Sequence, residues 1–576
     1  MGPKEGETPA AKRILQPFRL LRQDLRCLRQ RYISDWTVFN QLIVASAVFV
    51  FFSNLLPGLT FANDLYVSTD RNWGTIEVIF STGLCGVIFS LASAQPLTIL
   101  GVTGPFCILA ENLYSLCESS FGIPFLPFMA WSLIHAAWMH YLLAIFNAHD
   151  WTMIYVTNFT TEIFSLLNSV IYFHKAIQEL QRVHDQTSFA SFLYSIIGTI
   201  GTLLVAIFLS TAERWKPLFH RYIRMGLSEY AAAISIIIFI GLPHAGELAT
   251  LDRDSLPVSS SFRPTSPDRS TFFVQFWDLQ VGWIFAAIIP GCIITILFFF
   301  DHEISSIICT EERFGIRKPG GPAWDIILLG TTTAMCGILG IPPANGLLPQ
   351  APLHSQSLLH RETNTTASSD INENEKSEAN GCDTVYEQRW SHLLHAGGIL
   401  CFVSPPFMYV LGLTPTSVLA GLFLYMGEQS LSVNPILFRV FQLVTPTSEL
   451  PKLPEGIASY LPVHLYTIFQ VLVTAGIFVV TLTKAGPAFP VLIMALVPLR
   501  LTLMRRVWSR TALRFVDQWA CRHGAPEDMN EEESVTQVQA DDIVQDIEGG
   551  VAPRRQLPVF ERKDKIAPID ADLSNA

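Results

Sequence analysis

The chain has 576 residues and a formal net charge of −11; 50% of its residues are hydrophobic and only 15% are charged, against roughly 25% in an average soluble protein. Many apolar segments approach the roughly 20 residues that a helix needs to cross a bilayer, which argues against a large soluble enzyme and predicts a polytopic membrane protein. The acidic excess lies in polar segments outside these stretches, since residues 524–550 hold nine carboxylates and no Lys or Arg.

The first 35 residues are basic, with eight Lys and Arg, and they contain an apolar stripe at helical spacing. The stripe consists of Phe18, Leu21, Leu25, Leu28 and Tyr32. This pattern predicts an amphipathic helix that lies on the inner leaflet of the membrane. Basic clusters also occur at 214–224, 313–318 and 505–514. Because Lys and Arg gather in cytoplasmic loops, we expect both termini in the cytoplasm and an even number of spans.

Fourteen helical segments are expected, and two of them, the third and the tenth, are too short to cross a bilayer alone. In chain order they cover about 37–57, 74–93, 104–118, 124–146, 152–173, 188–211, 226–242, 280–302, 324–341, 343–358, 392–412, 415–430, 463–482 and 486–504. The proline-containing region 430–462 is expected to form a loop with a surface helix.

The order of the expected spans also assigns each long polar segment to one side of the membrane. The Ser- and Pro-rich residues 243–278 are expected outside the cell, and the acidic residues 359–391 inside it. The sequon at Asn364 would then face the cytoplasm, so we expect no glycan there. The acidic C-terminal tail has little apolar surface to bury and is predicted to be disordered. The ten cysteines lack metal-binding spacing and are interpreted as small core residues.

Two apolar segments are interrupted by proline and glycine. Residues 340–358 read GIPPANGLLPQAPLHSQSL, directly after the apolar stretch 326–341, and residues 94–106 read AQPLTILGVTGPF. A buried helix does not tolerate this density of proline, because each one removes a backbone donor and crowds the preceding turn. The breaks fall in the third and tenth segments, each the third in its half of seven, and this predicts an inverted-repeat transporter.

The breaks also predict a binding site. A helix that begins inside the membrane leaves its first N–H groups unpaired and carries about half a positive charge at that end. Two such ends that face each other would form an anion site without a lysine or arginine. Pro105 and Pro349 are expected to open the two short helices, and Gly104, Ala344 and Gly346 to let a solute approach the backbone. The alternative is that the prolines only kink two packed helices.

Ionisable side chains in apolar segments are further candidates, because a buried carboxylate is costly and usually functional. Asp301 follows the apolar run of the eighth segment and is the stronger candidate for a proton or coupling role, whereas Glu303 is expected at a solvated cytoplasmic rim. Glu77 and Glu111 are other candidates, with pairing inside the helix bundle as the alternative for Glu111. His354 in the tenth segment is interpreted as a packing residue.

Over most of residues 15–520 the chain resembles the solute-carrier family of bicarbonate and borate transporters, and within it the borate exporters of fungi and plants. The resemblance is carried by AQPLTILGVTGPF (94–106), RWKPLFHRYIRMGLSEY (214–230), FFFDH (298–302), LGIPPANGLLPQAPLHSQSL (339–358) and FLYMGEQSL (423–431). It implies an all-α polytopic membrane protein with 14 transmembrane segments in a 7+7 inverted repeat, half-helices at segments 3 and 10, and an elevator-like slide of a core domain against a gate domain.

The resemblance also implies a division of the chain. The expected parts are a cytoplasmic N-terminus (1–35), core residues 36–150 and 279–412, gate residues 151–245 and 413–510, an extracellular loop (246–278), a cytoplasmic loop (359–391) within the second core part, and a cytoplasmic tail (511–576). The gate domain would form the contact of a homodimer.

By the same resemblance, substrate lies between the starts of the third and tenth helices, with Thr103 and Gly104 on one side, Asn345 and Gln350 on the other, and Asp301 beside them. The family's chloride–bicarbonate exchangers have an arginine at the place of Gln350. A fixed cation favours a full anion, whereas an amide both donates and accepts hydrogen bonds, which suits a hydroxyl-rich solute such as boric acid or B(OH)4−. Those members also carry a large folded cytoplasmic domain, whereas about 35 residues precede the first expected span here. Both differences favour borate.

The sequence therefore predicts a borate exporter of the plasma membrane, without a cofactor, coupled to protons through Asp301 and Glu111. The first alternative is a bicarbonate or other inorganic anion exchanger of the same family. An intramembrane enzyme is disfavoured, because the sequence has no HExxH, GxSxG or phosphate-binding loop. A channel or scaffold is the remaining alternative.

Overall fold

Helices make up almost all of the regular structure in the computed structural model, which describes residues 16–244, 248, 254–310, 312–318, 320–348, 350–362, 382–453, 457, 459–520 and 524–528. The chain divides into two units, residues 1–523 and 524–576. All helices described below belong to the first unit.

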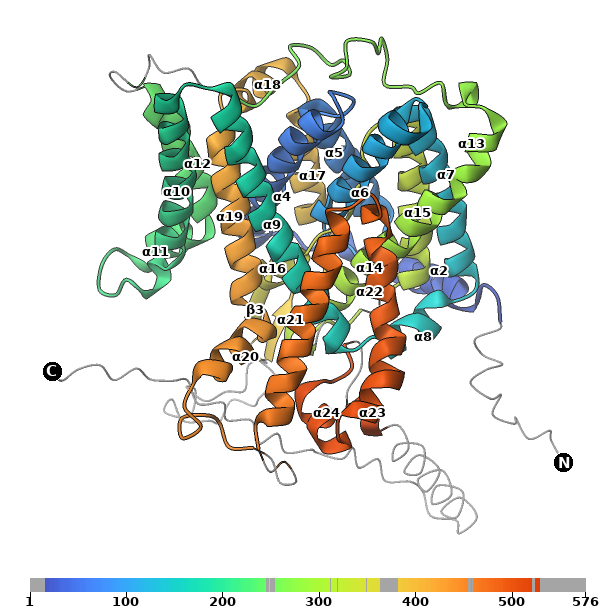
Figure 1. Ribbon diagram of the computed structural model, residues 1–576, viewed down its shortest axis with the longest axis vertical. Helices are drawn as coiled ribbons and strands as arrows, with labels where there is room; N and C mark the ends of the chain where they lie inside the picture. Colours follow the sequence, from blue (N-terminus) through green and yellow to red (C-terminus); the bar gives the residue numbers. More distant parts are fainter. Residues whose placement is uncertain are drawn as a thin grey trace. The chain divides into compact units, whose positions relative to one another are not determined.

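One set of helices, named here the first group, combines elements from both halves of the chain (Figure 1). Its members are α4 (Gln41–Ser68), α5 (Thr75–Ala92), α6 (Gly104–Leu116), α7 (Phe125–Ile145), α14 (Ile288–Cys309), α15 (Pro322–Leu339), α16 (Gln350–Ser357) and α17 (Trp390–Cys401). α7 packs against α14 and α15, and α17 packs against α4 and α5. The two halves of the chain are therefore interleaved in one core.

A second group also draws on both halves. Its members are α9 (Asn158–Gln186), α10 (Phe189–Ser210), α12 (Ala231–Gly241), α19 (Thr416–Ser432), α21 (Leu461–Thr481) and α22 (Phe489–Pro498). α9 packs against α19 and α21, and α10 packs against α12 and α19. The remaining helices are α2 (Arg19–Arg31), α3 (Ser34–Thr37), α8 (Ala148–Thr152), α11 (Arg221–Glu229), α13 (Val281–Ala286), α18 (Pro405–Leu411), α20 (Pro435–Val444), the π-helix η9 (Leu499–Met504), α23 (Arg505–Val507) and α24 (Arg510–Val516).

The length and composition of the helices identify a polytopic membrane protein. Each of the fourteen expected segments contains helix, but within the described residues eight helices are long and apolar enough to span a membrane, or ten if two bent pairs are counted as spans. The bent pairs are α11 with α12, at 71°, and α17 with α18, at 87°.

On α10, Ile197, Leu204 and Phe208 expose 59%, 59% and 62% of their surface. They form an apolar stripe suited to contact with lipid or with another protein.

The predicted amphipathic stretch forms the helix α2, whose buried residues lie outside the apolar stripe. Leu20 and Asp24 are buried, while Phe18 and Leu25 are each 40% exposed. Asp24 accepts a hydrogen bond at 3.1 Å from the backbone N–H of Trp324, in the first turn of α15.

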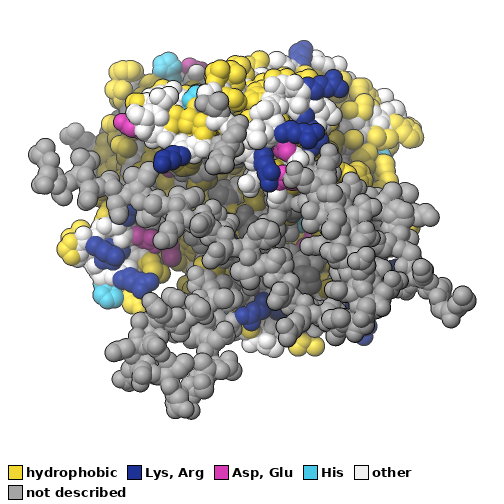
Figure 2. All heavy atoms as spheres, turned by 90° about the horizontal axis from the view of Figure 1, so that it is seen from below, with side chains coloured by type: hydrophobic (Ala, Val, Ile, Leu, Met, Phe, Trp, Pro, Cys, Tyr) yellow, Lys and Arg dark blue, Asp and Glu magenta, His cyan; other side chains and the backbone are white. Residues whose placement is uncertain are grey.

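Figure 2 shows Lys and Arg side chains spread over the described part of the molecule's lower face.

The tenth segment, placed at 343–358 with Pro349 expected to open its short helix, is helical only in its second part. α16 begins only at Gln350, and the preceding residues are extended and include β2 (Asn345–Gly346), which pairs antiparallel with β1 (Leu100–Gly101). The pairing with β1 holds Asn345 and Gly346 in a strand instead. Pro349 lies outside the described residues.

Two further segments were not predicted. β3 (Leu359–Glu362) and β4 (Cys382–Val385) form an antiparallel pair at the edges of the expected cytoplasmic loop, while Asn364 lies outside the described residues. The start of the predicted disordered tail is folded, because α24 leads into Asp517, whose carboxylate accepts a hydrogen bond at 2.5 Å from the buried Arg500. Residues 529–576 lie outside the described part.

Candidate functional site

The two interrupted segments meet inside the first group. Leu100 pairs with Gly346 and Gly101 with Asn345, and the N–H of Leu347 donates to the carbonyl of Ile99 at 2.9 Å. α6 starts three residues after β1, and α16 starts four residues after β2; from there the two helices run toward opposite ends of the molecule (Figure 1). Their N-termini therefore face a common region, as the breaks in the sequence predict.

Glycine allows close packing where these strands touch their neighbours. A side chain at Gly101 would lie 2.7 Å from atoms of both Asn54 and Leu347. At Gly346 it would lie 3.1 Å from the backbone of His302 in α14, closer than nearly all real contacts of this kind. The absence of a side chain thus lets β2 lie directly against the part of α14 that carries Asp301.

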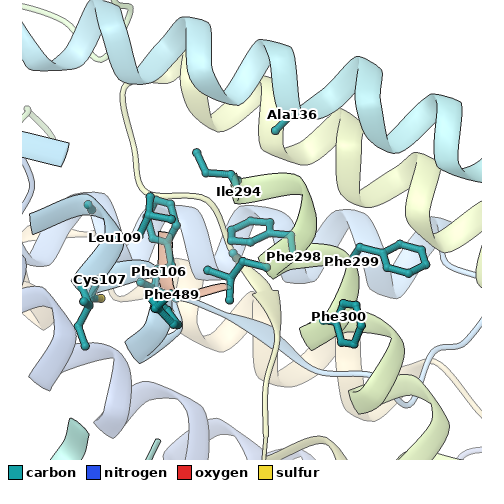
Figure 3. Packing of buried hydrophobic residues seen from close by; sticks show 14 of the residues in the cluster. Phe106, Cys107, Leu109, Ala136, Ile294, Phe298, Phe299, Phe300 and Phe489 are labelled. Carbon is teal, nitrogen blue, oxygen red and sulfur yellow. The ribbon is translucent and has the colours of Figure 1, made fainter. Parts of the chain in front are cut away.

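Aromatic packing fixes α14 at this position. Phe298 of α14 meets Phe106 of α6 edge to face, with ring centroids 5.6 Å apart (Figure 3). Phe299 and Phe300 leave the same helix in other directions and are also buried. Asp301 follows these three residues and is 3% exposed. Its Oδ2 accepts a hydrogen bond at 3.5 Å from Asn345, whose amide also donates to the carbonyl of Phe298 at 3.3 Å.

A small cavity between the two helix groups joins three of the predicted site residues. Thr103, Asp301 and Gln350 line it from the first group, and Asn168 and Tyr172 line it from α9 of the second. The cavity has a volume of about 20 Å³, which is room for about one water-sized group. We name it the central cavity.

The position of Gln350 depends on a proline in α4. Pro57 has no N–H to donate to the carbonyl of Ser53, four residues earlier. That carbonyl instead accepts a hydrogen bond from the Gln350 amide nitrogen at 3.4 Å. Pro57 itself lines the central cavity, so the helix irregularity and the site lie together.

Three other predicted residues do not line the central cavity. Gly104 opens α6 beside Tyr172, where an added side chain would lie 3.2 Å from the ring. Asn345 lies behind Asp301 and holds its carboxylate in place. Glu111 is farther along α6, where its carboxylate accepts a hydrogen bond from Lys175 at 2.5 Å. Glu111 is thus paired within the helix bundle, which is the alternative that the sequence left open for it.

Lys175 is the centre of a charged cluster that sequence reasoning missed. It extends from α9 to Asp64 of α4, at 3.0 Å, and to Glu111 of α6, so it ties the second group to the first. Arg182 also reaches Asp64, at 3.3 Å, and pairs with Glu179 at 2.7 Å. Lys175 falls just beyond the expected fifth segment, but a lysine directly after an apolar stretch was a signal that could have been used.

The expectation that Glu303 is solvated is wrong. The side chain is 1% exposed, and its carboxylate accepts a hydrogen bond at 2.6 Å from His149, because the short helix α8 brings that histidine over it. Burial opposes the charged form of His149, yet the neighbouring Glu303 carboxylate outweighs this and raises the pKa of His149 above its usual value.

Glu77 and His354 have structural partners. The Glu77 carboxylate caps the start of α5 by accepting from the N–H of Gly74 at 2.9 Å, and it binds Thr265. The ring of His354 bonds the carbonyl of Leu97 at 2.9 Å and the hydroxyl of Ser391 at 2.6 Å. This agrees with its interpretation as a packing residue.

A larger cavity, named here the vestibule, reaches Gln350 from one end of the molecule. It has a volume of about 410 Å³ and is bounded by both helix groups. Its polar lining includes Ser210, Glu213, Ser228, Glu229, Gln356 and Gln429. Among the described residues that line the vestibule or the central cavity, none is Lys or Arg.

The contribution of α9 to the central cavity was not predicted. Phe164, Asn168 and Tyr172 recur every four residues and thus share one face of the helix. An amide and a phenol on one face of an apolar segment are a usable signal. It was overlooked because the fifth segment carries no proline break.

Comparison with known proteins identifies relatives along most of the chain. Residues 16–192 and 185–520 match the family described as the HCO3- transporter integral membrane domain. The chain is 34% identical to the putative transporter C543.05c of Schizosaccharomyces pombe over 84% of this chain and 93% of that protein. It is 33% identical to boron transporter 1 of Saccharomyces cerevisiae over 82% of this chain and 80% of that protein. The fold resembles that of the murine anion transporter Slc26a9, with a TM-score of 0.52, 11% identity, and coverage of 88% of this chain and 74% of that one.

Proposed function

The chain belongs to the family of the HCO3- transporter integral membrane domain, and on that premise we propose that it exports boron, as boric acid or borate, across the plasma membrane. One observation carries the proposal: the chain shares a third of its aligned residues with a boron transporter along most of its length. The site chemistry agrees, because the central cavity presents hydroxyl, amide and carboxylate groups, which suit a hydroxyl-rich solute. A membrane transporter of this kind is not an enzyme and needs no cofactor.

We propose an elevator-type alternating access mechanism in which the first group carries the substrate past the second. The geometry supports this, because the central cavity lies between the groups and the vestibule meets it at Gln350. On the other side, Lys175 joins α9 to α4 and α6 and holds the groups together. These ion pairs would have to break when the first group moves. In this arrangement the vestibule faces the cytoplasm, where the basic clusters and both termini are expected.

We further propose that Asp301 carries the proton that is coupled to boron movement. It contributes the carboxylate of the central cavity, and Asn345 orients that carboxylate from behind. Glu111 enters the coupling proposal through its pairing with Lys175 rather than through contact with substrate. The exposed apolar stripe on α10 supports a homodimer formed through the second group.

The proposal is tested by measuring intracellular boron in cells that do or do not produce the protein, at several external pH values. Lower boron in the producing cells is expected, and equal boron in both would contradict the proposal.

A second candidate, exchange of bicarbonate or another inorganic anion, is favoured by the family's name. Labelled bicarbonate flux into proteoliposomes, with and without boric acid, separates the two. Bicarbonate flux that boric acid does not inhibit would favour the second candidate.

A further inference from the structure

The central cavity is lined by hydrogen-bond acceptors that have no partner among the described residues. These atoms are Thr103 Oγ1, Asn168 Oδ1, Asp301 Oδ1 and Gln350 Oε1. Thr103, Asp301 and Gln350 are only 7%, 3% and 6% exposed, so bulk water does not satisfy them. A buried acceptor without a donor is destabilising, and several that share one cavity indicate a ligand that donates hydrogen bonds.

Neighbouring contacts fix which atoms face the cavity. The amide nitrogen of Gln350 is bound to the carbonyl of Ser53, which turns the amide oxygen away from that contact. Asn345 binds Oδ2 of Asp301 and leaves Oδ1 free. In its ionised state, the carboxylate of Asp301 only accepts hydrogen bonds. The cavity therefore offers a solute four oxygens that can accept hydrogen bonds, beside the hydroxyl of Tyr172 and the amide of Asn168, which can also donate.

The charges around the cavity do not favour an added anion. Each half-helix N-terminus contributes about half a positive charge, so the two together are matched by the one carboxylate of Asp301. The nearest cation on α9, Lys175, is already paired with Asp64 and Glu111. The vestibule adds Glu213 and Glu229, and none of its described lining residues is cationic. A full anion would meet uncompensated negative charge on the way to the cavity and, while Asp301 is ionised, no net positive charge inside it.

Resting on the boron transport proposed above, we propose that the species bound in the central cavity is neutral boric acid, B(OH)3, held through its hydroxyl hydrogens by Thr103, Asp301 and Gln350. Its three O–H groups match an acceptor-rich, cation-free cavity. Bicarbonate has one O–H group and a negative charge, and chloride has none. The same groups that admit boric acid therefore discriminate against these anions.

The first test is the pH dependence of boron flux into liposomes that contain the purified wild-type protein, with the flux of protein-free liposomes subtracted. The pH is varied from near neutral to above the pKa of boric acid, with equal pH on both sides. The flux is expected to follow the concentration of B(OH)3 and to fall at alkaline pH. Flux that rises in proportion to B(OH)4− would overturn the inference but leave boron transport intact. No boron flux at any pH would instead contradict the proposed function.

The second test measures competition at one near-neutral pH, where changes in the protein's own ionisation play no part. Methylboronic acid, which is neutral and has two O–H groups, is expected to inhibit boron flux at a concentration at least about tenfold lower than bicarbonate, and chloride to have no effect. Equal inhibition by bicarbonate or chloride would overturn the inference.

A variant pair then ties the effect to one acceptor. Gln350→Leu removes an unpaired acceptor from the cavity and is expected to raise the half-saturating boric acid concentration about tenfold or more. Gln178→Leu is the matched control, because this buried amide on α9 also has an unpaired oxygen but lines a different cavity. An equal effect of both changes, or none from Gln350→Leu, would contradict the assignment.

Discussion

Replacement of Lys175 by methionine tests how the two helix groups are held together opposite the vestibule. The side chains of Lys175 and Asp64 are each 4% exposed, and removal of one partner from a buried ion pair costs about 3–5 kcal/mol. Asp64 keeps Arg182 at 3.3 Å and Glu111 is 34% exposed, so we expect the lower end of that range. The contact joins groups that must separate during transport. A loss of about 3 kcal/mol would therefore shift the equilibrium from the arrangement joined by Lys175 toward the separated one by more than about 100-fold.

Hydrogen–deuterium exchange of the purified protein measures this shift directly. In Lys175→Met the amides of 105–116 and 170–182 are expected to exchange faster than in the wild type. The double variant Asp64→Asn/Lys175→Met removes both charges and is expected to restore much of the protection, since a buried pair can be replaced as a whole at little cost. Lys318→Met is the control, because it breaks an ion pair with Asp35, which keeps Arg389. Unchanged exchange in Lys175→Met would refute the proposal that this cluster holds the two helix groups together.

Three further predictions concern the site and the membrane surface. Asp301→Ala removes the carboxylate from the central cavity. It is expected to abolish boron efflux while the purified protein still folds. Normal boron tolerance of cells that produce this variant would count against the role of Asp301. Gln350→Arg adds a cation beside that carboxylate, so boron flux is expected to weaken and halide or bicarbonate flux to appear; unaltered boron flux would show that this position does not set selectivity. Burial raises the pKa of Asp24 from 3.8 to about 6, so the folded state holds this proton more tightly than the unfolded state does. The free energy of unfolding is therefore expected to fall as the pH rises from about 4 to about 6. The loss is about 3 kcal/mol, and thermal unfolding in detergent is expected to show a weaker decline in Asp24→Asn; equal slopes would rule out Asp24 as its source.

The local chemistry of the breaks was predictable from the sequence because proline and glycine constrain the backbone directly. Pro105 takes the first turn of α6, as expected, and Gly346 lies where only a bare backbone fits against α14. The strand pairing of Asn345 and Gly346 was not predicted, since it depends on a segment more than 240 residues earlier. That pairing is a tertiary contact without a local signal.

The partners of charged residues were the least predictable part. Asp301 was found because its carboxylate follows an apolar run. Lys175 and Glu303 depend on distant helices that supply an opposite charge, Asp64 in one case and His149 in the other. Solvation therefore seemed the simpler expectation for Glu303. The helix positions could be predicted, whereas the ion pairs that lock them together follow only from the fold.

Saturable boron flux in proteoliposomes, measured with and without excess bicarbonate outside, tests the central claim most directly. The account predicts flux above that of protein-free liposomes, saturation with boric acid, loss in Asp301→Ala, and little inhibition by bicarbonate. Bicarbonate flux that saturates in place of boron flux, with boron entering no faster than through bare lipid, would contradict it.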